Sequence, residues 1–161
     1  MDKIIVVNGS PERMERLQLS LHKVGCEAIS AEHVLDVLDI LQNTEVRGVV
    51  MDLSMPGTKG WSMLRNLRTA GIALPIVALV GADTSYDRNL LLSMACKAGA
   101  SLAVPAHTHC AQVAEWMRDS LSGGDPSLSV VSCDAVEVTH HEDNPWVFQC
   151  VRKEHVPEVV A

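Results

Sequence analysis

Two apolar runs of this sequence end on polar residues of different kinds. The run "RGVVMDL" (47–53) contains a lone carboxylate, Asp52, and a Met-Pro-Gly sequence breaks the chain soon after it. The earlier run "KIIVV" (3–7) is followed by Asn8 and Gly9 and has no carboxylate. Hard cations such as Mg²⁺ prefer anionic oxygen ligands. The end of the later run therefore offers an anionic ligand for such a cation, and the end of the earlier run does not.

The elements that must position these residues are predicted by short β-branched runs that alternate with longer amphipathic runs over the first 121 residues. Ser10-Pro11 is typical of a helix start, and glycines are typical of helix ends. The predicted strands are 3–7, 26–30, 47–53, 75–80 and 101–104, and the helices that follow them are 11–24, 31–43, 61–70, 86–100 and 107–121. Apolar spacing predicts that these side chains face inward: Met14, Leu17, Leu21, Val24, Val34, Leu38, Leu41, Trp61, Leu64, Leu67, Val113, Trp116, Met117 and Leu121.

Five successive strand–helix units predict an α/β fold with a doubly wound, five-stranded parallel sheet. Crossovers of this kind are right-handed and place helices on both faces of the sheet. Ligands of such sheets bind beyond the C-terminal ends of the strands. Asp52 is at the end of the third strand and Asn8-Gly9 at the end of the first, so we expect them at this same rim, with Asp52 and Asn8 facing each other.

The C-terminal quarter of the chain differs in composition from the rest. Residues 1–121 are predicted to form one domain, 122–127 a linker, and 128–161 an extension with a β-hairpin over 128–154. Residues 122–161 contain seven acidic and two basic residues, which gives −5 of the formal charge of −7. A lone hairpin is marginal in water. The hairpin is therefore expected to pack on the domain, to pair with another chain, or to stay partly disordered.

Composition excludes several classes of function. The chain has 161 residues, 47% of them apolar and 20% charged, as expected of an ordered globular protein. Its net charge of −7 and its scarcity of aromatic residues argue against binding to nucleic acid. It has neither a run long enough for a membrane helix nor a signal peptide, so we expect a cytoplasmic protein. Five cysteines without CxxC spacing argue against a disulfide framework or a zinc knuckle.

The first 121 residues resemble the receiver domain of two-component response regulators, which has a flavodoxin-like fold. The resemblance rests on the fivefold strand–helix order, on "MDLSMPG" after the third strand, on "PIVALV" and on "AGA…VP". It implies that Asp52 is the position that accepts a phosphoryl group from a histidine kinase. It also implies that the main-chain carbonyl of Ser54 binds Mg²⁺. A domain of this kind is a signalling module, and we expect no enzymatic activity of its own.

The other positions of the receiver pattern are changed in this sequence. The family has an acidic pair where this chain has Asn8 and Gly9, a serine or threonine at Val80, and a lysine at Val104. Its aromatic switch residue corresponds to Ser101 or Leu102. One carboxylate beside a neutral amide is a poor set of Mg²⁺ ligands, so Asp52 and Ser54 are expected to form a weak Mg²⁺ site at best. No other cofactor is expected, and Lys59 is expected to be a solvated loop residue.

The expected function is that of a degenerate receiver: a phosphorylation-independent or weakly phosphorylated protein-interaction module in two-component signalling. Its expected partner is a histidine kinase or another signalling protein, without nucleic acid or membrane. It could also form a homodimer through the C-terminal extension or a face of the receiver. The alternative within the family is a phosphate-operated single-domain regulator that uses Asp52.

Two further alternatives come from other classes of protein. The stretch "VVNGSPER" (6–13) resembles the phosphate loop of flavodoxin-like NAD(P)H:quinone reductases, and Tyr86 is the aromatic residue nearest the rim. A metal protein is suggested by His107, His109 and Cys110. However, the two histidines do not share a helical face, and they are expected to be solvated residues in the first turn of a helix.

Overall fold

The protein is described by a computed structural model that covers residues 1–8, 10–54, 59–81, 87–122, 136–141 and 144–152. Its strands are β1 (Asp2–Val7), β2 (Cys26–Ala31), β3 (Gly48–Asp52), β4 (Ile76–Val80), β5 (Leu102–Pro105), β6 (Val136–His141) and β7 (Asn144–Arg152). Its helices are α1 (Pro11–Lys23), α2 (Val34–Asn43), α3 (Lys59–Thr69), α4 (Arg88–Ala98) and α5 (Cys110–Ser122). No helix within the described ranges is both long and apolar enough to span a membrane.

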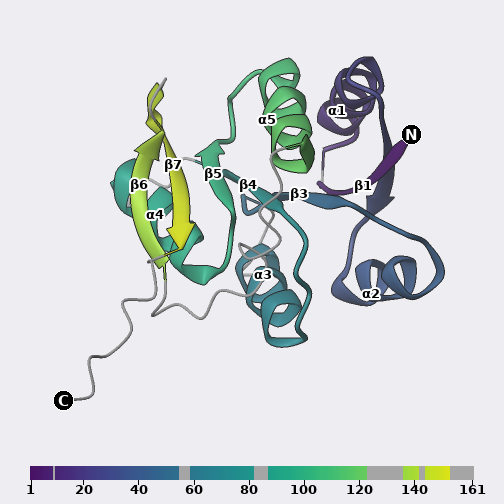
Figure 1. Ribbon diagram of the computed structural model, residues 1–161, viewed down its shortest axis with the longest axis horizontal. Helices are drawn as coiled ribbons and strands as arrows, with labels where there is room; N and C mark the ends of the chain where they lie inside the picture. Colours follow the sequence, from purple (N-terminus) through teal and green to yellow (C-terminus); the bar gives the residue numbers. More distant parts are fainter. Residues whose placement is uncertain (9, 55–58, 82–86, 123–135, 142–143, 153–161) are drawn as a thin grey trace.

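The strands form one sheet in the order β2-β1-β3-β4-β5-β7-β6. Pairing is parallel from β2 through β5, which confirms the predicted doubly wound sheet of five strands. Helices α1 and α5 lie on one side of this sheet, and α2 and α3 lie on the other (Figure 1). This arrangement brings the C-terminal ends of β1, β3, β4 and β5 to one edge of the sheet, which we call the rim.

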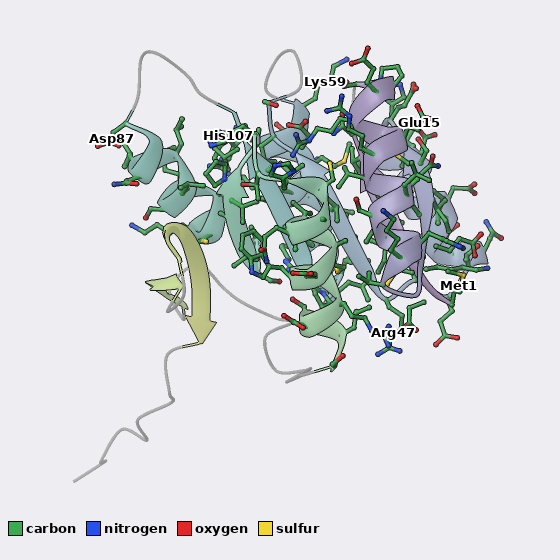
Figure 2. All side chains as sticks on the ribbon, turned by 90° about the horizontal axis from the view of Figure 1, so that it is seen from above. Met1, Glu15, Arg47, Lys59, Asp87 and His107 are labelled. Carbon is green, nitrogen blue, oxygen red and sulfur yellow. The ribbon has the colours of Figure 1, made fainter. Side chains whose placement is uncertain are left out.

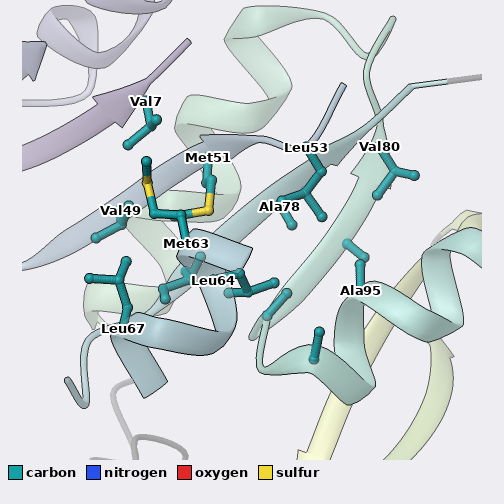
Figure 3. Packing of buried hydrophobic residues seen from close by; sticks show 14 of the residues in the cluster. Val7, Val49, Met51, Leu53, Met63, Leu64, Leu67, Ala78, Val80 and Ala95 are labelled. Carbon is teal, nitrogen blue, oxygen red and sulfur yellow. The ribbon is translucent and has the colours of Figure 1, made fainter. Parts of the chain in front are cut away.

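Each face of the sheet has its own hydrophobic core. Leu17 and Leu21 of α1 and Met117 of α5 have no solvent exposure and pack on one face. On the other face, Met63, Leu64 and Leu67 of α3 pack against strand residues and against α4 (Figure 3). Burying one such side chain contributes about 1.5–3 kcal/mol. The two cores therefore fix the strands whose ends make the rim.

Local signals explain where most helices begin and end. The Ser10 hydroxyl accepts a hydrogen bond from the Arg13 backbone N–H, with Pro11 as the first helical residue. Gly25 and Gly99 follow α1 and α4 with φ values of 83° and 125°, a region that residues with a side chain rarely adopt. These starts and stops confirm the predicted helices to within two or three residues.

Two predicted helix starts were three residues too early, and one predicted strand was one residue too early at both ends. Helix α2 begins at Val34 rather than at 31, because Asp36 accepts the His33 backbone N–H and caps the helix there. Its fully buried residue is Val37, whereas the predicted Val34, Leu38 and Leu41 are only partly buried. Helix α5 begins at Cys110, and β5 runs from Leu102 through Pro105.

The predicted hairpin is present as two antiparallel strands, β6 and β7. Strand β7 continues the sheet beyond β5 in the antiparallel sense, with Leu102 opposite Gln149 and Ala103 opposite Phe148. Helix α4 lies beside both strands (Figure 1). Of the options for the hairpin, the structure thus shows packing on the domain. Most of the predicted linker and the remainder of the extension lie outside the described residues, so the predicted domain limits stay a prediction.

Candidate functional site

The rim contains the two buried polar residues of the described part of the chain, Asn8 and Asp52, which are 8% and 7% exposed. Val7 is opposite Met51 in the parallel β1–β3 pair, so the next residues along, Asn8 and Asp52, are neighbours. Buried polar groups need hydrogen-bond partners. The predicted pair is thus brought together, and its hydrogen bonds decide what it can do.

Among the described residues, a single one, Ser54, donates hydrogen bonds to the Asp52 side chain. The backbone N–H of Ser54 donates to Oδ1 of Asp52 at 2.8 Å, and the Ser54 hydroxyl donates to the same oxygen. The next backbone N–H, from Leu53, donates to the carbonyl of Leu79 in β4 and holds this turn against the sheet. These hydrogen bonds therefore fix the position of the Asp52 carboxylate at the turn that follows β3. The Met-Pro-Gly sequence that follows lies outside the described residues.

The amide oxygen of Asn8, the atom that could bind a metal ion, already accepts a hydrogen bond. Its Oδ1 accepts the backbone N–H of Ser10 at 2.7 Å, which fixes which end of the amide is the oxygen. Its Nδ2 is buried and has no partner within the described part of the chain. An unsatisfied buried donor costs about 1–3 kcal/mol. Asn8 thus has a free N–H donor where the receiver family has a carboxylate, and Gly9, the other changed position, lies outside the described residues.

The β4 and β5 ends of the rim are apolar. Val80 is 4% exposed and belongs to the core under α2, α3 and α4. Val104 has no exposure and belongs to the core under α1 and α5. Val104 and Asp52 are in one row of the sheet, since Leu79 is the partner of both. Neither valine can donate a hydrogen bond to a phosphoryl oxygen.

Three further predicted positions are Lys59, Ser101 and Leu102. Lys59 is exposed, as expected, but it is the first residue of α3 and not a loop residue (Figure 2). Ser101 accepts the Ile76 backbone N–H and an N–H of Arg68, and so joins β4, β5 and α3. Leu102, the alternative switch position, is a core residue.

Arg13 is a cation beside the rim that was not predicted. Its Nη2 donates to the carbonyl of Thr108 at 3.0 Å, so the side chain joins the start of α1 to the loop before α5. Its Nε is buried and has no partner within the described ranges. A basic residue in the first turn of a helix opposes the helix dipole. That unfavourable position was the signal in the sequence that could have singled it out.

The residues present do not fit a receiver-type Mg²⁺ site. Mg²⁺ needs oxygen ligands in near-octahedral geometry. The amide oxygen of Asn8 is used by Ser10, and Oδ1 of Asp52 is used twice by Ser54. No second carboxylate lies beside them in the described residues, and the neighbouring Gly9 has no side chain. Of the two described side chains, only that of Asp52 has an oxygen, Oδ2, that accepts no hydrogen bond from the described residues, and the predicted carbonyl ligand of Ser54 would add a single neutral oxygen.

The other sites suggested by the sequence are placed as follows. His107 and His109 are exposed in the segment before α5, so their predicted place in the first helical turn was wrong (Figure 2 shows His107). No three His, Cys, Asp or Glu side chains come together as a metal site within the described ranges. Tyr86, the aromatic residue of the flavin alternative, lies outside the described residues.

The fold and the site define the class of this protein: a doubly wound α/β domain with an aspartate at the end of its central strand β3. The family model of the response regulator receiver domain matches residues 4–105. The chain therefore belongs to the response regulator receiver family. Receiver domains are signalling modules that interact with histidine kinases and other signalling proteins.

Individual relatives agree with this family. The response regulator MprA of Mycobacterium sp. (strain KMS) is 33% identical over 86 residues, which cover 53% of this chain and 37% of the relative. Protein PilH of Pseudomonas aeruginosa is 29% identical over 90 residues, which cover 55% of this chain and 74% of the relative. A response regulator structure from Thermotoga maritima matches 76% of this chain and 98% of its own with a TM-score of 0.64, and at 19% identity it supports the fold alone. The matched region spans little more than a third of the mycobacterial regulator.

Proposed function

We propose that this receiver is a protein-interaction module whose state is not set by ordinary Mg²⁺-dependent phosphorylation. The observation that carries the proposal is the orientation of Asn8, which has a free amide N–H beside Asp52 where a metal-binding carboxylate is expected. The buried side chains of Val80 and Val104 support it, since they remove two phosphoryl contacts. The module would act in the cytoplasm without enzymatic turnover, with a histidine kinase or another signalling protein as its partner.

The energetic argument concerns the transition state of phosphoryl transfer. Catalysis of this reaction rests on positioning and on neutralising charge. Each charge-assisted hydrogen bond that is missing costs about 1.5–3 kcal/mol, and about 1.4 kcal/mol corresponds to a factor of ten in rate. Several missing contacts would slow transfer to Asp52 by orders of magnitude. Binding through the outer surfaces of the domain does not depend on these contacts.

The test is phosphorylation by a small donor. Wild type and Asp52→Ala are incubated with acetyl phosphate, with and without Mg²⁺, and the intact mass is followed over time. We expect little phosphoryl addition to the wild type and no dependence on Mg²⁺. Stoichiometric, Mg²⁺-dependent addition that disappears in Asp52→Ala would overturn the proposal.

That contrary outcome would support a phosphate-operated regulator. The observation in favour of this second candidate is that Asp52 itself is retained at the end of β3, with Oδ2 free of hydrogen bonds from the described residues. Self-association through the extension is a separate part of the proposal. Sedimentation velocity of the whole chain over a range of concentrations measures it.

A further inference from the structure

The hydrogen bonds at Asp52 are unequally shared between its two oxygens. Both donors of Ser54, its backbone N–H and its hydroxyl, converge on Oδ1. No donor of the described residues reaches Oδ2. The two bonds close a tight turn over Asp52, Leu53 and Ser54, so the carboxylate is fixed in orientation as well as partly neutralised.

The chain makes room for this arrangement with two glycines from other elements. A Cβ at Gly81, just after β4, would lie 2.4 Å from Cβ of Ser54 and 3.3 Å from its Oγ. A Cβ at Gly60, in the first turn of α3, would lie 3.0 Å from the backbone carbonyl oxygen of Asp52 and from Cα of Leu53. Contacts below 3.0 Å are not formed by real side chains, so any residue other than glycine at 81 would displace Ser54. Ser54 can reach Asp52 because Gly81 has no side chain.

We propose that Ser54 is a positioning residue that holds Asp52 in an unreactive state. This inference rests on the proposed function and adds a cause for the weak phosphorylation beyond the missing contacts. A hydrogen bond to an ionised acceptor is stronger than one to a neutral acceptor. The Ser54 hydroxyl therefore stabilises free Asp52 more than it stabilises the acyl phosphate, in which the carboxylate has lost its charge.

The chemical step shows where this difference acts. A carboxylate oxygen of Asp52 attacks the phosphorus of acetyl phosphate, and a new O–P bond forms. The P–O bond to acetate breaks, and acetate leaves with the electron pair. The Asp52 carboxylate loses its negative charge as the O–P bond forms, and the departing acetate carries that charge away, so the bonds from Ser54 weaken as the reaction proceeds. Interactions that favour the ground state over the transition state slow a reaction.

The test compares acetyl phosphate labelling rates of Ser54→Ala and wild type by intact mass. Loss of a hydrogen bond to a charged group predicts that Ser54→Ala is labelled roughly ten times faster. Ser54→Thr keeps the hydroxyl and should return the rate to that of the wild type. Ser62→Ala is the matched control, because Ser62 is an exposed serine of α3 and makes no hydrogen bond to Asp52.

Gly81→Ala is an independent way to remove the hydrogen bond between Ser54 and Asp52, since the added Cβ would push Ser54 away from Asp52. It should raise the labelling rate in the same direction, and the double variant with Ser54→Ala should show no further gain. Thermal unfolding of each variant checks that the fold is intact. Gly81→Ala is discounted if it unfolds, and Ser54→Ala with its threonine rescue then decides.

The inference is overturned if Ser54→Ala is labelled at the rate of the wild type, including the case in which neither shows any addition. It is also overturned if Ser54→Thr behaves like Ser54→Ala. These outcomes differ from a failure of the proposed function, which is judged only by whether the wild type is labelled stoichiometrically in the presence of Mg²⁺.

Discussion

The rim of the sheet has a polar half and an apolar half. At the ends of β1 and β3, Asn8 and Asp52 are buried, and the Oδ1 atom of each accepts hydrogen bonds, from Ser10 and from Ser54 respectively. At the ends of β4 and β5, Val80 and Val104 belong to the two hydrophobic cores. One half thus keeps buried polar groups that are only partly hydrogen-bonded within the described residues, and the other half extends the interior of the protein.

Under the proposed function, the two halves would lack phosphoryl contacts in two different ways. Replacing a hydroxyl or ammonium group by a buried valine removes a contact and adds apolar burial, which stabilises the fold. Replacing a carboxylate by Asn8 removes a charge but leaves a buried donor without a partner, which carries a cost. The apolar half should therefore contribute to stability, whereas the polar half should mainly control the reactivity of Asp52.

The largest effect is expected when both halves are restored together. The combined variant Asn8→Asp, Gly9→Asp, Val80→Thr and Val104→Lys supplies the missing carboxylates, hydroxyl and ammonium. Acetyl phosphate labelling in Mg²⁺ should rise by roughly a hundredfold or more, because several charge-assisted contacts return at once. Intact mass measures the labelling, and the same variant with Asp52→Ala is the control. No response would mean that the backbone of the rim differs from that of an active receiver.

The apolar half can be broken by Val104→Ala. Val104 has no solvent exposure, and its loss leaves a cavity under α1 and α5. The free energy of unfolding should fall by about 2 kcal/mol, measured by urea denaturation. Leu35→Ala is the control, because Leu35 is 74% exposed and should change stability by less than about 0.5 kcal/mol. Equal effects of the two variants would show that Val104 is not part of the core.

The substitution Ser10→Ala tests the helix cap beside the polar half of the rim. The Ser10 hydroxyl accepts the Arg13 backbone N–H at 3.4 Å and caps α1, while its backbone N–H still holds Asn8. Loss of the cap should lower the free energy of unfolding by about 1 kcal/mol. Urea denaturation with Ser62→Ala as the control measures this effect. A loss as large as that of Val104→Ala would contradict the division of roles between the two halves.

The smallest effect is expected from truncation after Gly123, which removes β6 and β7 but leaves both halves of the rim. The described pairing between β5 and β7 involves Leu102 and Ala103. A net hydrogen bond contributes about 1 kcal/mol, so stability should fall by roughly that amount or less and labelling should not change. Hydrogen exchange at Leu102 and Ala103 is the local readout. A change in sedimentation coefficient from dimer to monomer would show that the extension mediates self-association. If stability, hydrogen exchange and sedimentation all stay the same, the extension neither stabilises the domain nor mediates self-association.

The fold could be predicted from the sequence because the spacing of apolar residues and the residues at helix ends are features of short segments. Every predicted strand and helix of the first 121 residues is present, in a parallel sheet of the expected kind. The start of α2 was missed because the N-cap residue is His33, which is not a preferred capping residue, and the capping hydrogen bond is accepted by Asp36 three residues later. The start of α5 was missed because the polar segment before it is equally compatible with a first helical turn.

The site was predictable in its positions but not in its hydrogen bonds. The adjacency of Asn8 and Asp52 follows from two strands that end together. The orientation of the Asn8 amide depends on a single backbone N–H, that of Ser10, and no spacing rule reveals it. The contact of Arg13 with Thr108 joins residues 95 positions apart, and only the tertiary structure brings them together.

The pairing of β7 with β5 has a consequence for any partner that recognises backbone rather than side chains. The open side of β5 is already paired with a strand of the same chain, which is tethered through residues 123–135 to the end of α5. A strand that belongs to the same chain as its partner competes at an effective concentration on the order of millimolar. A free strand of equal intrinsic affinity would need to reach a similar concentration to take its place. A separate strand can therefore replace β7 beside β5 only if it binds more tightly than β7 or is present at high concentration.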